Sequence, residues 1–441
     1  MKNYIRIQKK IESFNKSIQV SGDKSISIRC VLMASQAIGK SKIFNLLESE
    51  DVINSLNSIK RLGINYKKFK NYYEIYGFGI KGFKTKKKVT INAGNSGTLA
   101  RLMIGLLVDT ENQVKIIGDK SLSERDFARV TEPIKLFGPN IVSNKNKLPV
   151  KITGSKYLRP IKYSEYLGSA QCKSSVMLAA LKTPGITTIK AKKSRDHTEL
   201  LFKSLNLPIK IKKKINYDYI EIKGEQNFNS FNYNVPGDIS SCSFFLVLTL
   251  LGHKSKLLIK NININNTRTG IIKILNRMNA KILFKNKKKY KGELVADILV
   301  KSKSSLKSIN CPASLNSSAI DEFLIIFLVA AKAKGISNFK NLGELNKKES
   351  PRLNLAINFL KKIGIKVLRK NNNVKIYGNP DLELDGQFIM NNFRKDHRVF
   401  MMSCVAALVF GGSWKISDKD STNTSFPKFL SIIQKLGGKI N

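Results

Sequence analysis

Acidic residues are scarce in this chain of 441 residues, which has 31 Asp and Glu against 78 Lys and Arg and a formal net charge of +47. An excess of this size favours nucleic acid or another anionic partner. The lysines, however, gather in runs such as 84–88, 210–214 and 285–291, beside abundant Asn and Ile. AT-rich codons supply these three residue types, so we favour compositional drift and do not expect nucleic acid as a partner.

Long apolar runs and paired cysteines are also missing. The longest apolar runs, 244–251 and 323–331, are well short of the roughly 20 residues that span a bilayer. The first ten residues are polar and lack the apolar centre of a secretory signal. The five cysteines are scattered, without a C-x-x-C pair. We therefore expect a cytoplasmic protein without a membrane span, a disulfide or a zinc site.

The chain instead contains an internal repeat. Six clusters of small, polar and charged residues each lead into an apolar stretch, and they start about 70 to 80 residues apart. The clusters cover residues 21–27, 93–98, 168–174, 235–241, 317–322 and 394–398. The apolar stretches predict buried helices, and apolar residues at i, i+3 and i+4 predict a second, amphipathic helix after each. Alternating segments then predict strands in several units.

Each unit is thus predicted to contain a strand, a buried helix, a strand, an amphipathic helix and a hairpin, in the order βαβαββ. The chain is too long for one ordinary core. We therefore predict an α/β (α+β) fold with two lobes of three units each. The N-terminal lobe is expected to cover 21–238, and the C-terminal lobe 1–20 together with 239–441.

The starts of the buried helices are candidate anion sites, because free N–H groups and the helix dipole favour negative charge there. Gly97 permits close backbone approach, and Ser96 and Thr98 offer hydroxyl groups. Residues 22–25 look like the end of a P-loop, but no glycine stands five residues before Gly22, so a nucleotide site is not supported. For any single cluster, a plain helix cap is the alternative.

Basic residues near these starts also suit anion binding, since Arg can bind phosphate or carboxylate through two parallel hydrogen bonds. Three pairs stand four residues apart and are expected to share a helix face, namely Ser25 with Arg29, Arg125 with Arg129, and Lys348 with Arg352.

Acids at the same places have two explanations. Asp321, Glu322, Glu349 and Asp396 either interact with the helix dipole or perform acid–base work beside bound anions.

Eight motifs together resemble those of the 5-enolpyruvylshikimate-3-phosphate synthases, in the family's order and over nearly the whole chain. They are SGDKSIS (21–27), GNSGT (94–98), SAQCKS (169–174), SRDHTE (194–199), VPGDISS (235–241), IDEF (320–323), KES (348–350) and DHR (396–398).

The resemblance implies two lobes, each a threefold pseudo-symmetric assembly of βαβαββ units with its helices inside, and an active site in the cleft between them. It also implies transfer of the carboxyvinyl group of phosphoenolpyruvate to the 5-hydroxyl of shikimate 3-phosphate, with release of phosphate, in the shikimate route to aromatic amino acids. It implies no metal and no organic cofactor, and we expect a monomer.

The same resemblance implies roles for individual residues. Asp321 is the expected base for the hydroxyl, and Lys24 and Glu349 are expected to move the proton at the methylene carbon. The residues expected at shikimate 3-phosphate are Lys24, Ser25, Arg29, Ser169, Ala170, Ser194, Arg195, Asp321 and Lys348. Those expected at phosphoenolpyruvate are Lys24, Asn95, Gly97, Arg125, Gln171, Arg352 and Arg398.

Three residues depart from the family pattern. Ile28 stands where His is usual, Pro351 where Asp is usual, and Thr424 where many members have Lys. We expect these changes to remove local hydrogen bonds without removing the chemistry, because the matched charged residues remain.

Two other functions are less well supported. A UDP-N-acetylglucosamine carboxyvinyltransferase usually carries a loop cysteine in its N-terminal lobe, and this chain has none between Cys30 and Cys172. A nucleic-acid-binding scaffold without catalysis would explain the charge, but it would not explain why four residues occur together, namely Lys24, Asp321, Glu349 and Arg398.

Overall fold

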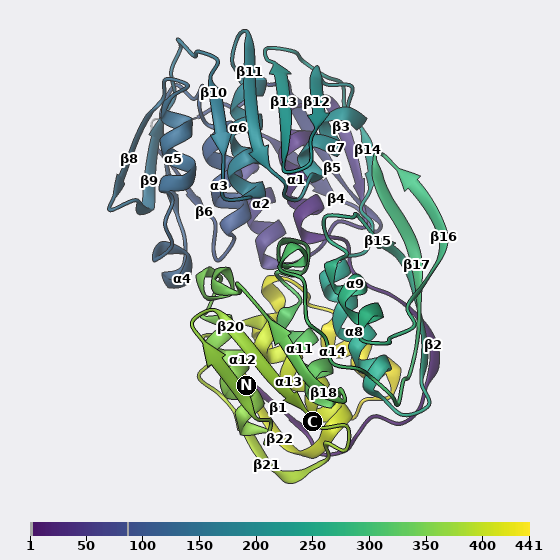
Figure 1. Cartoon of the computed structure of the whole chain (residues 1–441). Coiled ribbons are helices and arrows are strands. Elements are labelled where there is room, and N and C mark those ends of the chain that lie inside the picture. The colour runs from purple at the N-terminus through teal and green to yellow at the C-terminus, as the bar shows by residue number, and fades with distance from the viewer. Residues whose placement is uncertain (1–2, 86–87) are drawn as a thin grey trace. The chain divides into compact units, whose positions relative to one another are not determined.

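The computed structural model describes residues 3–85 and 88–441 (Figure 1). The chain forms two compact units. The N-terminal unit consists of 22–235 with the short segment 291–293, and the C-terminal unit of the segment ending at Ser21, 236–290 and 294–441. The chain leaves the N-terminal unit after Val235, whereas the sequence predicts this boundary after Asp238.

The N-terminal unit contains three four-stranded sheets of one design, each with an edge strand parallel to its neighbour and two antiparallel strands beyond. The first consists of β14 (Asn232–Asn234), β3 (Ile38–Phe44), β5 (Tyr72–Phe78) and β4 (Asn65–Lys68). The second consists of β6 (Lys88–Asn92), β7 (Gln113–Ile117), β9 (Lys147–Thr153) and β8 (Asn140–Asn144). The third consists of β10 (Lys162–Glu165), β11 (Ile186–Lys192), β13 (Tyr217–Lys223) and β12 (Ile209–Lys213).

Each of these sheets is accompanied by one buried and one amphipathic helix. The buried helices are α1 (Lys24–Gln36), α3 (Gly97–Leu106) and α6 (Ala170–Lys182). The amphipathic helices are α2 (Glu50–Arg61), α5 (Ala128–Lys135) and α7 (His197–Ser204), and a short helix, α4 (Lys120–Ser123), precedes α5.

The C-terminal unit repeats this design with small changes. Its first sheet consists of β16 (Leu283–Tyr290), β17 (Glu293–Lys301), β15 (Lys256–Asn263) and β2 (Asn15–Gln19). The second consists of β18 (Gly335–Phe339), β20 (Asn373–Gly378) and β19 (Val367–Lys370), and the third of β21 (Leu384–Met390), β22 (Gly411–Ser417) and β1 (Tyr4–Ile7). The helices are α8 (Ile239–Leu251), α9 (Gly270–Arg277), α10 (Asn316–Ala319), α11 (Phe323–Lys332), α12 (Arg352–Lys362), α13 (His397–Phe410) and α14 (Phe429–Leu436).

The changes affect strands at the sheet edges. In the second sheet, isolated bridges from Lys307 to Lys334 and from Asn310 to Asn338 take the place of a parallel edge strand. In the third, the N-terminal strand β1 pairs with β22, and backbone hydrogen bonds between Arg6 and Asn441 bring the chain end alongside. The predicted α/β fold of six related units is therefore confirmed.

The buried helices lie inside because they have no polar face. In α8, for example, the run from Phe244 to Leu250 is buried throughout. Two lysines of the buried helix α6 each pair with a carboxylate, as expected for charges in a low-dielectric interior. In α6, Lys173 Nζ lies 2.5 Å from Glu199 Oε1, and Lys182 Nζ lies 2.8 Å from Asp109 Oδ1. The described helices include none with the length and apolar character needed to cross a membrane.

Candidate active site

The starts of the six buried helices are capped by side chains in five cases. The side chains of Asp23, Ser96, Ser169, Asp238 and Asp396 each accept a hydrogen bond from a backbone N–H in the first turn. The sixth helix, α11, follows Glu322, whose side chain makes no such bond. The cap explanation therefore holds for these residues, and the functional candidates are their neighbours.

Arg29 is the centre of a buried polar cluster in the N-terminal unit. Its Nε donates to Thr198 Oγ1 at 2.7 Å, its Nη2 to Ser174 Oγ at 3.1 Å, and its Nη1 to the Ser25 carbonyl at 3.0 Å. Burial lowers the pKa of Arg29 to about 10. The last of these bonds confirms that Ser25 and Arg29 share a face of α1, and the other two connect α1 to α6 and α7.

Lys24, at the first position of α1, contacts the next helix. Its Nζ lies 2.9 Å from Asp51 Oδ2, and the Lys24 side chain keeps 19% of its surface exposed while Asp51 keeps 7%. The pair holds the ammonium group in place at the helix start. Ile28, the first departure from the family pattern, is fully buried in the core below it.

Asn95 and Arg125 contact each other near the start of α3. Arg125 Nη2 donates to Asn95 Oδ1 at 3.1 Å, and Asn95 Nδ2 donates to Asp119 Oδ2 at 2.6 Å. Among the described residues, the buried Arg125 Nε has no hydrogen-bond partner. The prediction that Arg125 shares a helix face with Arg129 is wrong, because Arg125 lies in the turn between α4 and α5.

Gly97 could not be replaced without a shift of these side chains. A Cβ atom there would lie 2.6 Å from Arg101 Nη1 and 3.1 Å from Arg125 Nη1. Two guanidinium groups thus lie beside the first residue of α3, in space that is open because Gly97 has no side chain. Arg101 was not among the residues expected at the site, although a charge inside the apolar run of α3 is a visible signal in the sequence.

The start of α6 contributes Ser169 as the cap, Ala170 as the first helical residue and Gln171 after it. Gln171 Nε2 donates to Thr98 Oγ1 at 2.9 Å, which connects α6 to the start of α3. Ser194 and Arg195 lie in the loop before α7, and within the described part of the chain the buried Ser194 Oγ has no hydrogen-bond partner.

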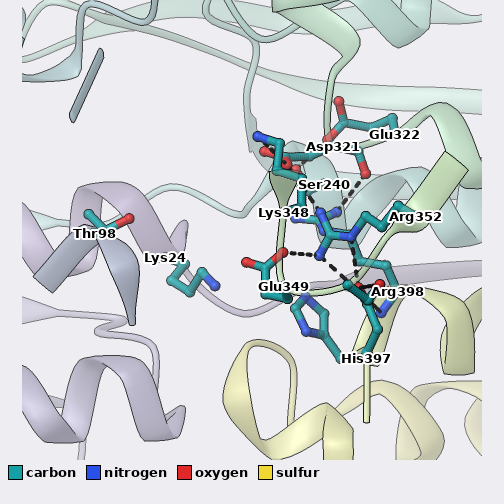
Figure 2. A network of polar contacts seen from close by, with 12 residues as sticks. Lys24, Thr98, Ser240, Asp321, Glu322, Lys348, Glu349, Arg352, His397 and Arg398 are labelled. Carbon is teal, nitrogen blue, oxygen red and sulfur yellow. Dashed lines mark hydrogen bonds and ion pairs between the residues drawn. The ribbon is translucent and has the colours of Figure 1, made fainter. Parts of the chain in front are cut away.

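Arg352 holds the candidate residues of the C-terminal unit together. Its Nε lies 2.9 Å from Asp396 Oδ2, its Nη2 2.5 Å from Glu349 Oε2, and its Nη1 3.5 Å from Asp321 Oδ1. Figure 2 shows the Glu349 carboxylate joined to this guanidinium. Burial alone would lower the pKa of Arg352, but these three carboxylates outweigh it and raise the pKa above its ordinary value.

The carboxylate of Asp321 also contacts Lys348, whose Nζ lies 3.6 Å from the same Oδ1 atom. Arg398 Nη1 donates to the Asp321 carbonyl at 3.0 Å. Asp321 is therefore surrounded by all three cations that the sequence assigned to this part of the chain. The prediction that Lys348 and Arg352 share a helix face is wrong, since Lys348 precedes α12 and the chain turns between them.

The two other departures from the family pattern have local explanations. Pro351 is the N-cap of α12, and the preceding Ser350 donates its hydroxyl to Asp396 Oδ2 at 2.7 Å. Thr424 Oγ1 lies 3.2 Å from His397 Nδ1. Neither change disrupts the carboxylates around Arg352.

A second buried network in this unit was missed from the sequence. Arg268 Nη2 donates to Ser240 Oγ at 2.9 Å and contacts Asp238 Oδ1 at 3.2 Å, and Ser240 in turn donates to Glu322. It ties the start of α8 to the residue directly after Asp321. No group of His, Cys, Asp and Glu suited to hold a metal ion occurs in residues 3–85 and 88–441.

Comparison with solved structures identifies the class of protein. The enolpyruvyl transferase NikO from Streptomyces tendae has the same fold, with a TM-score of 0.77 over 99% of this chain and 98% of that chain, at 13% identity. EPSP synthase from Acinetobacter baumannii is more similar, with a TM-score of 0.88 over 99% of both chains at 32% identity. The fold is thus that of the enolpyruvyl transferases.

Sequence comparison then identifies the family. The family model for EPSP synthase (3-phosphoshikimate 1-carboxyvinyltransferase) matches residues 8–433. The 3-phosphoshikimate 1-carboxyvinyltransferase of Ruthia magnifica is 37% identical over 440 residues, 99% of this chain and 98% of the relative. That of Petrotoga mobilis is 38% identical over 430 residues, 96% of this chain and 98% of the relative. The chain belongs to the EPSP synthase family, and the UDP-N-acetylglucosamine alternative is not favoured.

Proposed function

We propose that this chain transfers the carboxyvinyl group of phosphoenolpyruvate to the 5-hydroxyl of shikimate 3-phosphate and releases phosphate, a step of aromatic amino acid biosynthesis. Family membership supports the reaction, and its relatives carry the corresponding name. The observation that carries the residue assignment is the position of Asp321, whose carboxylate contacts Lys348 and Arg352 while its carbonyl accepts from Arg398. A carboxylate among cations suits proton removal beside bound anions.

The proposed reaction has two steps. In the addition, Asp321 takes the hydroxyl proton, the oxygen bonds to the central carbon of phosphoenolpyruvate, and the methylene carbon gains a proton. In the elimination, that carbon loses a proton, the double bond forms again and phosphate leaves. We assign the proton transfers at the methylene carbon to Lys24 and Glu349.

Arg29 and the residues around it form the proposed shikimate 3-phosphate site in the N-terminal unit. Within the described part of the chain, the three hydrogen bonds that Arg29 donates go to neutral oxygens, which leaves its charge suited to an anion. The buried Ser194 Oγ, without a partner among the described residues, supports the same assignment. The other residues proposed to bind shikimate 3-phosphate are Lys24, Ser25, Ser169, Ala170, Arg195, Asp321 and Lys348.

Phosphoenolpyruvate is proposed to bind at Gly97, Asn95, Arg125 and Gln171, with Lys24. The Arg125 Nε atom, buried and without a partner in the described residues, supports anion binding there. Arg398 is a further residue proposed to bind phosphoenolpyruvate. Arg352 was predicted as a further ligand, and its three carboxylate partners support an added role in holding Asp321 and Glu349.

Clustered cations serve the chemistry as well as binding. Two anionic substrates repel each other, and the tetrahedral intermediate carries both phosphate and carboxylate. Fixed positive groups offset that repulsion and stabilise the intermediate when water is excluded.

Phosphate release by the purified protein tests the proposal. We expect release only when phosphoenolpyruvate and shikimate 3-phosphate are both present, and a large loss in Asp321→Ala and in Lys24→Ala. Arg61→Met, at an exposed position in the last turn of α2, should leave the rate unchanged. Absence of release from the unaltered protein, or unchanged rates in both active-site variants, would contradict the assignment.

The cytoplasmic location, the monomeric state and the absence of nucleic-acid binding stay predictions. Light scattering on a sizing column measures the oligomeric state. A gel shift with duplex DNA at physiological ionic strength measures nucleic-acid binding, which falls steeply with salt when it is electrostatic.

A further inference from the structure

We infer that Arg101 is a positioning residue for the phosphoenolpyruvate site, where it fixes the orientation of the Gln171 amide. The inference rests on the proposed function, in which Gln171 binds phosphoenolpyruvate. Arg101 is the one charged residue in the ten-residue helix α3, whose other residues are apolar apart from Thr98.

The guanidinium of Arg101 is held by several contacts. It lies over the ring of Phe127, with Cζ 5.0 Å from the ring centroid. Its Nη2 donates to the Asp126 carbonyl at 3.5 Å, and its Nη1 to the Gly97 carbonyl at 3.4 Å. A cation fixed over an aromatic face, with backbone oxygens at its rim, is a rigid support.

The strongest of these contacts goes to Gln171. Arg101 Nη1 donates to Gln171 Oε1 at 2.8 Å, while Gln171 Nε2 donates to Thr98 Oγ1 at 2.9 Å. A guanidinium has only donors, so it can pair with the amide oxygen and not with the amide nitrogen. Arg101 therefore fixes the positions of the oxygen and the nitrogen of the Gln171 amide. The second N–H of Nε2 then remains to donate to an anion.

Without Arg101, the amide could turn over and present its oxygen to the substrate. An acceptor oxygen facing a phosphate or carboxylate is repulsive, whereas an N–H is attractive. The cost of losing Arg101 should therefore fall on phosphoenolpyruvate binding. It should fall much less on shikimate 3-phosphate, which the proposed function places at Arg29 and Ser194.

The competing explanation is that Arg101 binds the anion directly. Its Nη1 lies close to Gly97, as does that of Arg125, since a Cβ atom at Gly97 would lie 2.6 Å and 3.1 Å from the two. A double-mutant cycle separates the explanations, because residues that act through one another have effects that do not add.

The experiment compares unaltered protein, Arg101→Met, Gln171→Ala and the double variant, with KM for each substrate and kcat measured for all four. We expect Arg101→Met to raise KM for phosphoenolpyruvate about tenfold, as for loss of a hydrogen bond to a charged group, with KM for shikimate 3-phosphate within about twofold of normal. In the Gln171→Ala background, the Arg101 change should have less than about a twofold effect. Additive effects, or equal changes in both KM values, would overturn the inference.

Two further variants test the same inference if Arg101→Met folds poorly. Thr98→Val removes the acceptor of the other amide hydrogen bond while it leaves Arg101 in place, and should raise the same KM by a smaller factor. Arg101→Lys retains a donor and should recover part of the affinity. If neither variant moves KM for phosphoenolpyruvate, the inference is wrong. If the unaltered protein releases no phosphate at all, the proposed function fails instead.

Discussion

Arg352 and Asp396 form a buried ion pair in which Nε and Oδ2 are 2.9 Å apart, and their side chains are 1% and 0% exposed. The pair joins the start of α12 to the start of α13. The same carboxylate accepts from the Ser350 hydroxyl through Oδ2 and caps α13 through Oδ1, which accepts from the Arg398 amide. One side chain thus stabilises two helix starts and the guanidinium that contacts Asp321 and Glu349.

Removal of this carboxylate should destabilise the C-terminal unit strongly. We expect Asp396→Ala to cost about 3–5 kcal/mol, because it leaves Arg352 buried with one partner fewer. Ser169→Ala, which removes only a cap, should cost about 1 kcal/mol. Urea unfolding followed by far-ultraviolet circular dichroism, which reports on both units, measures the two costs. A cost for Asp396→Ala no larger than that of a cap would contradict this account.

The contribution of Asp396 should also depend on pH. Burial alone would raise the pKa of Asp396, but the charges of Arg352 and His397 outweigh burial and lower the pKa below its ordinary value. The stabilisation is then fully present above the unfolded pKa, about 4, and is lost as pH falls through the lower folded pKa.

The stability difference between the unaltered protein and Asp396→Asn measures this effect. The amide keeps an oxygen for the cap but cannot carry the charge. We expect the difference to be constant between about pH 8 and 5 and to shrink as pH falls below about 4. A difference that grows in acid would mean that the carboxyl group is buried in its neutral form.

The repeat and the buried helices were predictable from the sequence because they depend on local composition. A run such as Phe244 to Leu250 has no polar face, so it is buried wherever it packs. The polar clusters at 93–98 and 168–174 likewise predicted helix starts, and both helices are capped by a serine side chain. Local patterns of this kind give the fold, since six similar units have few ways to bury their helices.

The contacts of the site were not predictable to the same degree. Arg29 binds Ser174 and Thr198, which are 145 and 169 residues away in the sequence, and no spacing rule connects them. The spacing of four between Arg125 and Arg129 suggested a shared face only on the assumption of a continuous helix, and the chain turns there.

The lysine-rich segment before Glu293 gives a further example. The segment has the composition of a solvated surface, and nothing in it indicates that the next acidic residue is buried. Glu293 is nevertheless 2% exposed, and its Oε1 lies 2.6 Å from His197 Nδ1. Such a contact depends on where a distant hairpin ends. Sequence pattern alone does not contain that information.

Arg29 should be needed as arginine and not only as a cation. Its planar head donates to three oxygens in different directions, and a lysine ammonium on a flexible stem cannot reproduce that geometry. We expect Arg29→Lys to raise KM for shikimate 3-phosphate at least about tenfold, with a smaller effect on KM for phosphoenolpyruvate. Steady-state kinetics with each substrate varied in turn provide the measurement, and Lys192→Arg, at an exposed position, is the matched control. Equal KM values for Arg29→Lys and the unaltered protein would remove Arg29 from the proposed site.

Gly97→Ala should weaken phosphoenolpyruvate binding without unfolding the protein. The added methyl group would lie 2.6 Å from Arg101 Nη1 and 3.1 Å from Arg125 Nη1, and both atoms are the far ends of flexible side chains. The helix can therefore stay in place while the two guanidinium groups are displaced from the contacts that hold them, so we expect a free energy of unfolding within about 1 kcal/mol of normal. Movement of Arg101 and Arg125 disturbs the groups that orient Gln171 and bind the anion, so KM for phosphoenolpyruvate should rise about tenfold or more. Kinetics and urea unfolding on the same preparation check both parts. A large loss of stability with unchanged KM would show instead that Gly97 is required for packing of α3.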